Sequence, residues 1–216
     1  MPSIVDTSPY ADSPRNEMLK YVPSTALRVL DVGCHTGAFG KSLKAKGIAE
    51  VWGIEPNDET RRIASEYLDK VLDGFFCERL ELEDQYFDVI VFNDVLEHMP
   101  DPWSALELAR KKLNPEGRIV ISLPNIRFID NIIHMLKERD FRYEPNGIRD
   151  ITHLRFFTKK SIPRLFEKSD LEIVSLEGIN EGWWSPSIFR RIAFKLFSEY
   201  LDDTKYLQFA VVVKPS

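Results

Sequence analysis

The sequence predicts an α/β protein with a doubly wound, mostly parallel sheet, and three observations support this prediction. Short β-type runs alternate with helical patterns along most of the chain. The first apolar run leads directly into a glycine-punctuated turn and then into a helical pattern. The length of 216 residues suits one domain over residues 1–216 better than two independent hydrophobic cores.

The expected strands are short. They lie at Leu27–Asp31, Val51–Ile54, Lys70–Leu72, Phe87–Phe92, Arg118–Leu123, Leu171–Leu176 and Leu207–Val213. The helical patterns between them cover Ala38–Lys46, Asp58–Leu68, Pro102–Leu113 and Ser161–Lys168. Asp101 and Pro102 are typical of an N-cap followed by a first-turn proline, and Asn114–Gly117 ends that helix.

Two insertions interrupt this alternation. Residues 125–157 follow the fifth strand, and residues 180–206 precede the last strand and carry an amphipathic pattern over Ser187–Tyr200. Ligands of open α/β sheets bind outside the carboxyl ends of the strands, so we expect both insertions to build the substrate side. Residues 1–25 are expected to form an N-terminal helical lid.

The composition argues against several classes of protein. A net charge of −5 does not suit a general nucleic-acid binder, because neutralising phosphates needs concentrated Lys and Arg. The two cysteines, Cys34 and Cys77, give neither a disulfide framework nor metal-ligand spacing. The first ten residues carry no basic leader or apolar stretch, and no apolar run approaches the roughly 20 residues that span a bilayer. We therefore expect a cytoplasmic protein.

The turn after the first strand is the strongest candidate for a ligand site. Gly33 and Gly37 allow the backbone to approach a ligand closely, and the following helix begins with unpaired N–H groups. A dinucleotide fingerprint and a phosphate-binding P-loop each require glycine where this chain has His35, although Gly40-Lys41-Ser42 supplies the end of a P-loop.

The negative charge of Asp31 distinguishes a phosphate-bearing ligand from a cationic one. Asp31 at the end of the strand would repel a polyphosphate, whereas it would attract a cation. S-adenosylmethionine (SAM) carries a sulfonium and an ammonium and has no phosphate, so it suits this loop. A tight turn without any ligand is the structural alternative.

The pattern Asp31-x-Gly33-x-x-x-Gly37 resembles motif I of class I SAM-dependent methyltransferases. The next strand ends in Glu55, whose carboxylate can accept both ribose hydroxyls. The resemblance implies a Rossmann-like fold with an antiparallel last strand, and it implies that Asn93 and Asp94 line the methionine end of the cofactor. The predicted cofactor-binding residues are Asp31, Gly33, Cys34, Gly37, Glu55, Asn93 and Asp94.

The chain departs from the family pattern at two places. His35 lies where many members have glycine or alanine, which crowds the turn. Residues 73–77 lack the Gly-Asp pair that commonly reaches the adenine amino group. The adenine is expected instead beside Phe75 or Phe76, and the sequence does not choose between them.

Methyl transfer to a hydroxyl needs alignment and removal of a proton. His153 and His98 are the candidate bases. The alternative for His153 is a packed histidine bonded to backbone carbonyls. The spacing Asp94-x-x-Glu97-His98 resembles the metal-binding arrangement of some quinone O-methyltransferases, but we expect Glu97 and His98 to cap and orient their helix and expect no metal.

The acceptor is the open part of the prediction. Motifs around Arg15, Asp94, Asn125 and His153 resemble a subgroup associated with O-antigen and surface-polysaccharide biosynthesis, which implies a sugar or glycan hydroxyl. Trp183-Trp184 suits packing on a sugar ring, although buried packing is the commoner use of such a pair. The alternatives are a quinone-like small molecule with metal assistance and, in another class, a non-catalytic SAM-fold partner subunit.

The amphipathic helix expected over Ser187–Tyr200 has an apolar face that must pack against another surface. We expect this face to pack on the domain or on a second subunit in a homodimer, and peripheral contact with a membrane is the less favoured alternative. No nucleic-acid partner is expected.

Overall fold

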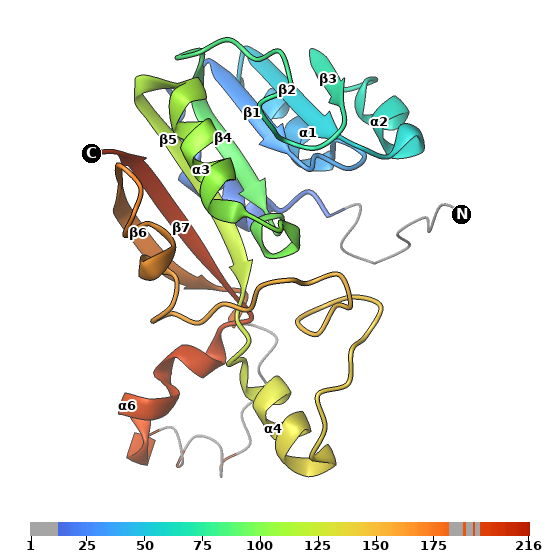
Figure 1. Ribbon diagram of the computed structural model, residues 1–216. Coiled ribbons are helices and arrows are strands. Elements are labelled where there is room, and N and C mark those ends of the chain that lie inside the picture. The colour runs from blue at the N-terminus through green and yellow to red at the C-terminus, as the bar shows by residue number, and fades with distance from the viewer. Residues whose placement is uncertain (1–12, 182–187, 189–191, 193–194) are drawn as a thin grey trace.

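The computed structural model describes residues 13–181, 188, 192 and 195–216 (Figure 1). Within these residues the strands form one sheet in the order β3-β2-β1-β4-β5-β7-β6. Their bounds are β1 Arg28–Val32, β2 Glu50–Glu55, β3 Lys70–Asp73, β4 Phe87–Asn93, β5 Leu113–Pro124, β6 Leu171–Ile179 and β7 Gln208–Pro215. Strand β7 is antiparallel to both β5 and β6, while β1 to β5 pair in parallel. The predicted doubly wound sheet and its antiparallel last strand are confirmed.

The helices alternate with the strands as expected. The α-helices are α1 Ala38–Ala45, α2 Asp58–Ala64, α3 Pro102–Lys112, α4 Ile129–Glu138 and α6 Ser198–Leu201. The 3-10 helices are η1 Asn16–Tyr21, η2 Leu96–His98, η3 Pro163–Leu165 and η5 Asp202–Lys205. Asp101 caps α3 as predicted, because its carboxylate accepts the backbone N–H of Ser104 at 3.1 Å.

The helix predicted over Ser161–Lys168 is wrong. Only the short 3-10 turn η3 forms there. Thr158 and Ser161 each accept the other's backbone N–H through a hydroxyl oxygen, at 2.8 and 3.1 Å, and this reciprocal turn competes with helical hydrogen bonding. The spacing of Ile162, Leu165 and Phe166 suggested a helix, but one tight turn suffices to bury all three side chains.

The amphipathic pattern over Ser187–Tyr200 falls largely outside the described residues, and Trp183 and Trp184 fall outside them entirely. Of the predicted N-terminal lid, the structure describes residues from 13 onward, where η1 buries Met18 against the face of the sheet that carries α1. No helix in the described part of the chain has the length and apolarity needed to cross a membrane.

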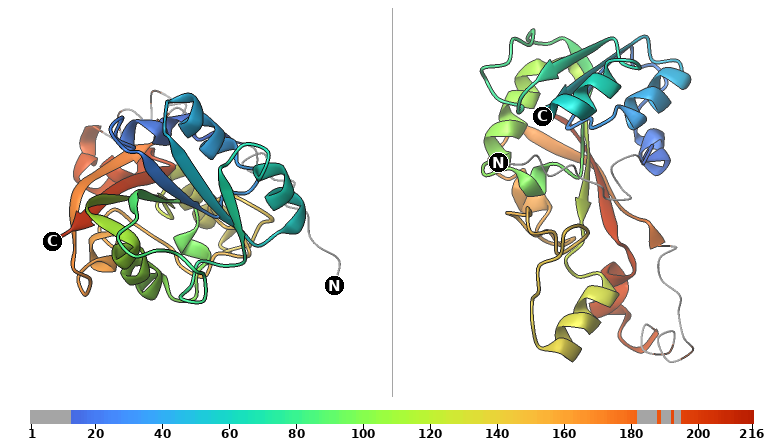
Figure 2. Two further views of the ribbon diagram at one scale, coloured as in Figure 1. Left: turned by 90° about the horizontal axis from the view of Figure 1, so that it is seen from above. Right: turned by 90° about the vertical axis from the view of Figure 1, so that its right-hand side faces the viewer.

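The sheet has a hydrophobic core on each face. Successive residues of a strand point to opposite faces, so Leu30 and Val32 pack with α3 in one core, while Val29 packs with α1 in the other. Figures 1 and 2 show the same two layers of helices. This alternation also puts Asp31 on the α1 side of the sheet.

Strand order reverses between β1 and β4, which lie side by side at the centre of the sheet. In doubly wound sheets the crevice at such a switch point, outside the carboxyl ends of the strands, is where ligands bind. Helices α4 and α6 lie beyond this edge (Figure 1). The two insertions are therefore beside the expected ligand site.

Gly178 on β6 provides a test of the packing at this edge. An added Cβ would lie well inside van der Waals contact with the Tyr206 ring. Gly178→Ala should therefore lower the free energy of unfolding by about 1–3 kcal/mol, measured by urea denaturation. Val174→Ala is the control, because Val174 is 48% exposed on the same strand and its truncation should change stability by no more than about 0.5 kcal/mol. Equal stabilities of the two variants would contradict the close packing of Gly178.

Candidate active site

The loop between β1 and α1 is held tightly against the end of β2. The backbone N–H groups of Gly33 and Cys34 both donate to the carbonyl of Ile54, at 2.9 and 3.1 Å. Gly33 has φ 71°, and a Cβ there would lie 2.9 Å from a methyl group of Val95. Glycine is therefore required at position 33 both by conformation and by space. His35 takes a left-handed conformation as well, with φ 48°, which agrees with the crowding expected at this residue.

Glu55 at the tip of β2 organises the same loop. One carboxylate oxygen accepts the backbone N–H of His35 at 2.9 Å, and the other accepts that of Asn57 at 2.9 Å. Asn57 in turn caps α2. Glu55 is 7% exposed, and each of its oxygens retains acceptor capacity for a ligand hydroxyl.

Asp31 is a buried carboxylate, and one of its oxygens lacks a hydrogen-bond partner within the described structure. It is 2% exposed, and its Oδ2 has no hydrogen-bond partner among the described residues. Burial, together with the neighbouring charge of Glu55, raises the pKa of Asp31 from 3.8 to about 7. The side-chain amide of Asn93 is similarly buried, and neither its nitrogen nor its oxygen has a partner in the described structure. These groups fit SAM, whose ammonium and sulfonium would compensate the buried charge.

Two cavities bring the predicted site residues together. The first, of about 460 Å³, is lined by Asp31, Gly33, Cys34, Asn93, Asp94, His98 and His153 among others. The second, of about 1000 Å³, shares four of these residues, Gly33, Asn93, Asp94 and His98, and adds Glu55, Phe75 and Phe76. Gly37 lines neither cavity. Its φ of 79° and its hydrogen bond to the Cys34 carbonyl make it part of the loop's support.

The two phenylalanines differ in a way that the sequence did not reveal. Phe76 is buried and packs edge-on against Phe92, with ring centroids 5.6 Å apart. Phe75 is 77% exposed. Phe75 is therefore the ring with a face available to a ligand, and Phe76 belongs to the core.

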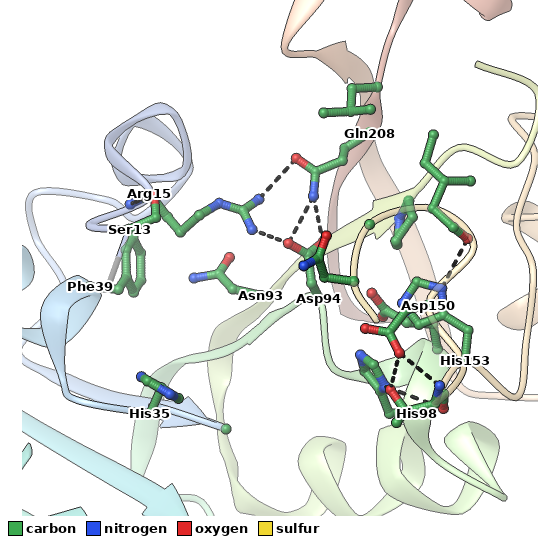
Figure 3. A pocket seen from close by; sticks show the side chains of 18 of the residues that line it. Ser13, Arg15, His35, Phe39, Asn93, Asp94, His98, Asp150, His153 and Gln208 are labelled. Carbon is green, nitrogen blue, oxygen red and sulfur yellow. Dashed lines mark hydrogen bonds and ion pairs between the residues drawn. The ribbon is translucent and has the colours of Figure 1, made fainter. Parts of the chain in front are cut away.

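The carboxylate of Asp94 is held by three other segments of the chain, and Figure 3 shows its contacts with Arg15 and Gln208. Arg15 forms an ion pair with it, the amide of Gln208 donates to both of its oxygens at 2.8 Å, and the hydroxyl of Ser122 donates at 2.9 Å. Asp94 itself has φ 54°. Its side chain thus serves to fix the turn after β4, which carries Asn93 into the first cavity.

The two candidate bases lie against each other. The ring centroids of His98 and His153 are 4.7 Å apart in an edge-on arrangement. His153 is 8% exposed, and burial and the neighbouring His98 lower its pKa. A neutral imidazole of this kind retains a lone pair for a proton at pH 7.

Glu97 completes a cluster with this pair. Its side chain is fully buried, and neither carboxylate oxygen has a partner among the described residues. Burial, followed by the charge of Asp94, raises its pKa well above the ordinary value. Ligand atoms of Glu97, His98 and His153 all lie within 4.8 Å of one another. Two imidazoles and a carboxylate are a donor set that a divalent ion accepts, and the same groups can share a proton without any ion.

Sequence reasoning missed several residues of the site. It did not assign Gln208 or Asp150, and it treated Arg15 only as part of a resemblance. Gln208 had a usable signal, because a buried amide at the start of the apolar run of β7 needs polar partners. The alternative triad of Asp94, Glu97 and His98 is not assembled, since Asp94 pairs with Arg15 and it is His153 that lies beside Glu97 and His98.

The stability of the ligand-free protein should fall as pH rises from about 4 to about 7. Because folding raises the pKa of Asp31, the folded protein retains a proton over this range that the unfolded chain has already released. The proton held by Asp31 changes the free energy of unfolding by up to about 1.4 kcal/mol per pH unit. Urea unfolding at several pH values would measure this slope, and Asp31→Asn should flatten it. An unchanged slope in the variant would show that Asp31 is already ionised in the folded protein.

Comparisons with known proteins agree with this geometry. A protein-family model described as a methyltransferase domain matches residues 6–176. The ubiquinone biosynthesis O-methyltransferase of Neisseria meningitidis is 28% identical over 162 residues, which cover 70% of this chain and 66% of that protein. The mitochondrial enzyme of the same name from Dictyostelium discoideum is 27% identical over 180 residues, which cover 74% and 54%. The chain thus spans between half and two thirds of the length of these relatives, and neither is named for polysaccharide biosynthesis.

A solved structure described as a SAM-dependent methyltransferase from Archaeoglobus fulgidus superposes with a TM-score of 0.67 at 22% identity, over 92% of this chain and 91% of that one. This likeness confirms the Rossmann-like methyltransferase fold. The family model covers well over half of the sequence. This chain therefore belongs to the family of methyltransferase domains.

Proposed function

We propose that this chain is a SAM-dependent methyltransferase that transfers a methyl group to a hydroxyl of a small-molecule acceptor. The observation that carries the proposal is the 460 Å³ cavity that joins the β1–α1 loop to the histidine pair (Figure 3). A cofactor held by the loop and a base able to take a proton from an acceptor would therefore share one cavity.

The cofactor supplies an electrophilic methyl group on a sulfonium, together with a neutral sulfide as leaving group. Asp31 would hold the positively charged methionine end, and Glu55 would accept the ribose hydroxyls. Asn93 offers both a donor and an acceptor beside them. Gly33 and Cys34 contribute backbone that approaches closely.

The bound cofactor would supply its methyl group to the acceptor oxygen and leave as the neutral sulfide, and the acceptor's proton would pass to the histidine pair. We assign this proton to His153 with His98 beside it, because both line the cavity. Alignment of the two reactants supplies most of the remaining rate.

We infer that the acceptor carries an aromatic or quinone-type hydroxyl. The names of the curated relatives support this class. So does a chain of edge-on aromatic contacts that runs from Tyr143 through Phe141 and Phe156 to His153, with centroids 5.4, 5.5 and 6.3 Å apart. A sugar hydroxyl is the competing class, and the Trp183-Trp184 pair that favoured it lies outside the described residues. Assays with catechols, hydroquinones and sugar nucleotides would separate the two classes, and SAM binding without any transfer would indicate a non-catalytic subunit.

Binding of S-adenosylhomocysteine, measured by calorimetry, should be in the micromolar range, about −8 kcal/mol, with no binding of ATP or NAD at similar concentrations. Glu55→Ala should weaken it by about 2–3 kcal/mol, because charged hydrogen bonds are lost. Glu59→Ala is the matched control, since Glu59 is an exposed acid in the first turn of α2. ATP binding in place of S-adenosylhomocysteine would overturn the assignment of the loop.

His153→Asn should lower turnover by about 10²–10⁴-fold and change the affinity for S-adenosylhomocysteine by less than about threefold. Asparagine keeps a donor for the carbonyl of Ile148, which His153 Nδ1 contacts at 3.2 Å, so the substitution separates base chemistry from packing. Comparable loss of cofactor binding, or a melting temperature several degrees lower, would identify a packing histidine.

Metal-assisted transfer is the second candidate function. It is favoured by buried Glu97, whose carboxylate oxygens have no hydrogen-bond partner among the described residues and offer one ligand atom within 4.8 Å of a ring nitrogen of each histidine. We propose metal-free transfer, because protonation of Glu97 removes its buried charge without an ion. Turnover that survives EDTA would support this choice. Activity lost to EDTA and restored by magnesium or zinc would favour the second candidate.

A further inference from the structure

The hydrogen bonds around His98 determine which of its ring nitrogens carries a proton. Thr152 Oγ1 lies 2.9 Å from His98 Nδ1 and 2.6 Å from a carboxylate oxygen of Asp150. The backbone N–H of Thr152 donates to the same Asp150 oxygen at 2.7 Å. The carbonyl oxygen of Thr152 is 3.3 Å from His98 Nδ1.

A threonine hydroxyl has one proton to donate. Asp150 as a carboxylate accepts only, so the short contact of 2.6 Å takes that proton. The hydroxyl oxygen then has only lone pairs to offer His98, and Nδ1 must be the donor. The carbonyl of Thr152 is likewise an acceptor and requires the same assignment. A neutral imidazole has one N–H, so its other nitrogen, Nε2, carries the lone pair.

His153 has the same tautomer, and a single hydrogen bond determines it. His153 Nδ1 lies 3.2 Å from the carbonyl of Ile148, which accepts only. Two neighbouring imidazoles therefore both keep their protons on Nδ1. Only for His98 does the chain of hydrogen bonds end in a charged group, Asp150.

The contacts also fix where the two histidines lie relative to each other. The backbone N–H groups of Leu154 and Arg155 both donate to the carbonyl of Glu97, at 2.8 and 3.1 Å. This joins the turn that carries His98 to the loop that carries His153. Thr152 adds a side-chain link between the same two segments.

We propose that Thr152 and Asp150 are positioning residues that hold His98 in its Nδ1–H tautomer and thereby leave the lone pair of Nε2 free to take part, beside His153, in the transfer of the acceptor's proton. The role in catalysis rests on the O-methyl transfer proposed above. The tautomer does not, and it is measurable in the protein alone. A carboxylate that orients an imidazole through hydrogen bonds is a recurrent device, and its loss can cost much of the rate by releasing the wrong tautomer.

Nitrogen-15 spectra of histidine-labelled, EDTA-treated protein test the tautomer directly. The His98 signals are assigned by comparison with His98→Asn. Wild-type protein should show Nδ1–H, and Thr152→Val should populate Nε2–H, because only the long contact of 3.3 Å to the carbonyl remains. Asp150→Ala is a second variant, since without the carboxylate oxygen that accepts it the Thr152 hydroxyl proton is free to donate to His98 Nδ1. Thr158→Val is the matched control, because it removes a threonine hydroxyl just after the insertion, and that hydroxyl is hydrogen-bonded to the backbone N–H of Ser161 and to neither histidine.

Turnover supplies the second readout. Thr152→Val should lower kcat by about tenfold or more and leave the affinity for S-adenosylhomocysteine unchanged, and Thr152→Ser should restore both the tautomer and the rate. Nε2–H in the wild type, or a tautomer and rate that neither Thr152→Val nor Asp150→Ala changes, would overturn the proposal. If Thr152→Val changes the His98 tautomer but the wild-type protein methylates no hydroxyl, the positioning role of Thr152 and Asp150 is upheld and the proposed function is refuted.

Discussion

The carboxylate of Asp94 joins four segments that lie far apart in the sequence. Arg15 comes from the N-terminal segment, Asp94 from the turn after β4, Ser122 from β5 and Gln208 from β7. Buried polar groups of this kind must all be satisfied together, because any one left alone would carry the full cost of desolvation. The shape of the cavity thus depends on a network whose members are contributed from both ends of the chain.

The charges around the site are strongly unbalanced without a ligand. Asp31 is buried beside Glu55, Glu97 is buried beside Asp94, and Arg15 is already engaged by Asp94 and Glu17. Protonation of the carboxylates relieves this imbalance, and burial raises the pKa values of Asp31 and Glu97 in the direction that favours it. A cationic ligand relieves the same imbalance without protons. Electrostatics therefore favour the same cofactor that the motif suggests.

Much of the fold and the cofactor loop could be predicted from the sequence, because these features are local. Short β-type runs, the N-cap at Asp101 and the glycines at 33 and 37 each leave a signal within a few residues. Parallel pairing then brings the ends of β1, β2 and β4 to one edge, so Asp31, Glu55 and Asn93 were predictable as neighbours.

The remaining part of the site depends on where the insertions fold. His98 and Thr152 are 54 residues apart, and Asp94 and Gln208 are 114 apart, so no local pattern records either pairing. The short turn at 158–166 was missed for a different reason: its apolar spacing is equally compatible with a helix, and the choice is made by two hydroxyl groups.

The double hydrogen bond from Leu154 and Arg155 to the Glu97 carbonyl has a consequence for how such a site can diversify. It anchors the backbone of the loop at the point where the histidine enters, while the side chains of Tyr143, Ile151, Leu154 and Phe156 on the same loop remain exposed at its surface. Exchanging these side chains would leave the backbone anchor intact. Under the proposed function, substitutions at these exposed side chains would change acceptor preference and leave the His98–His153 pair in place.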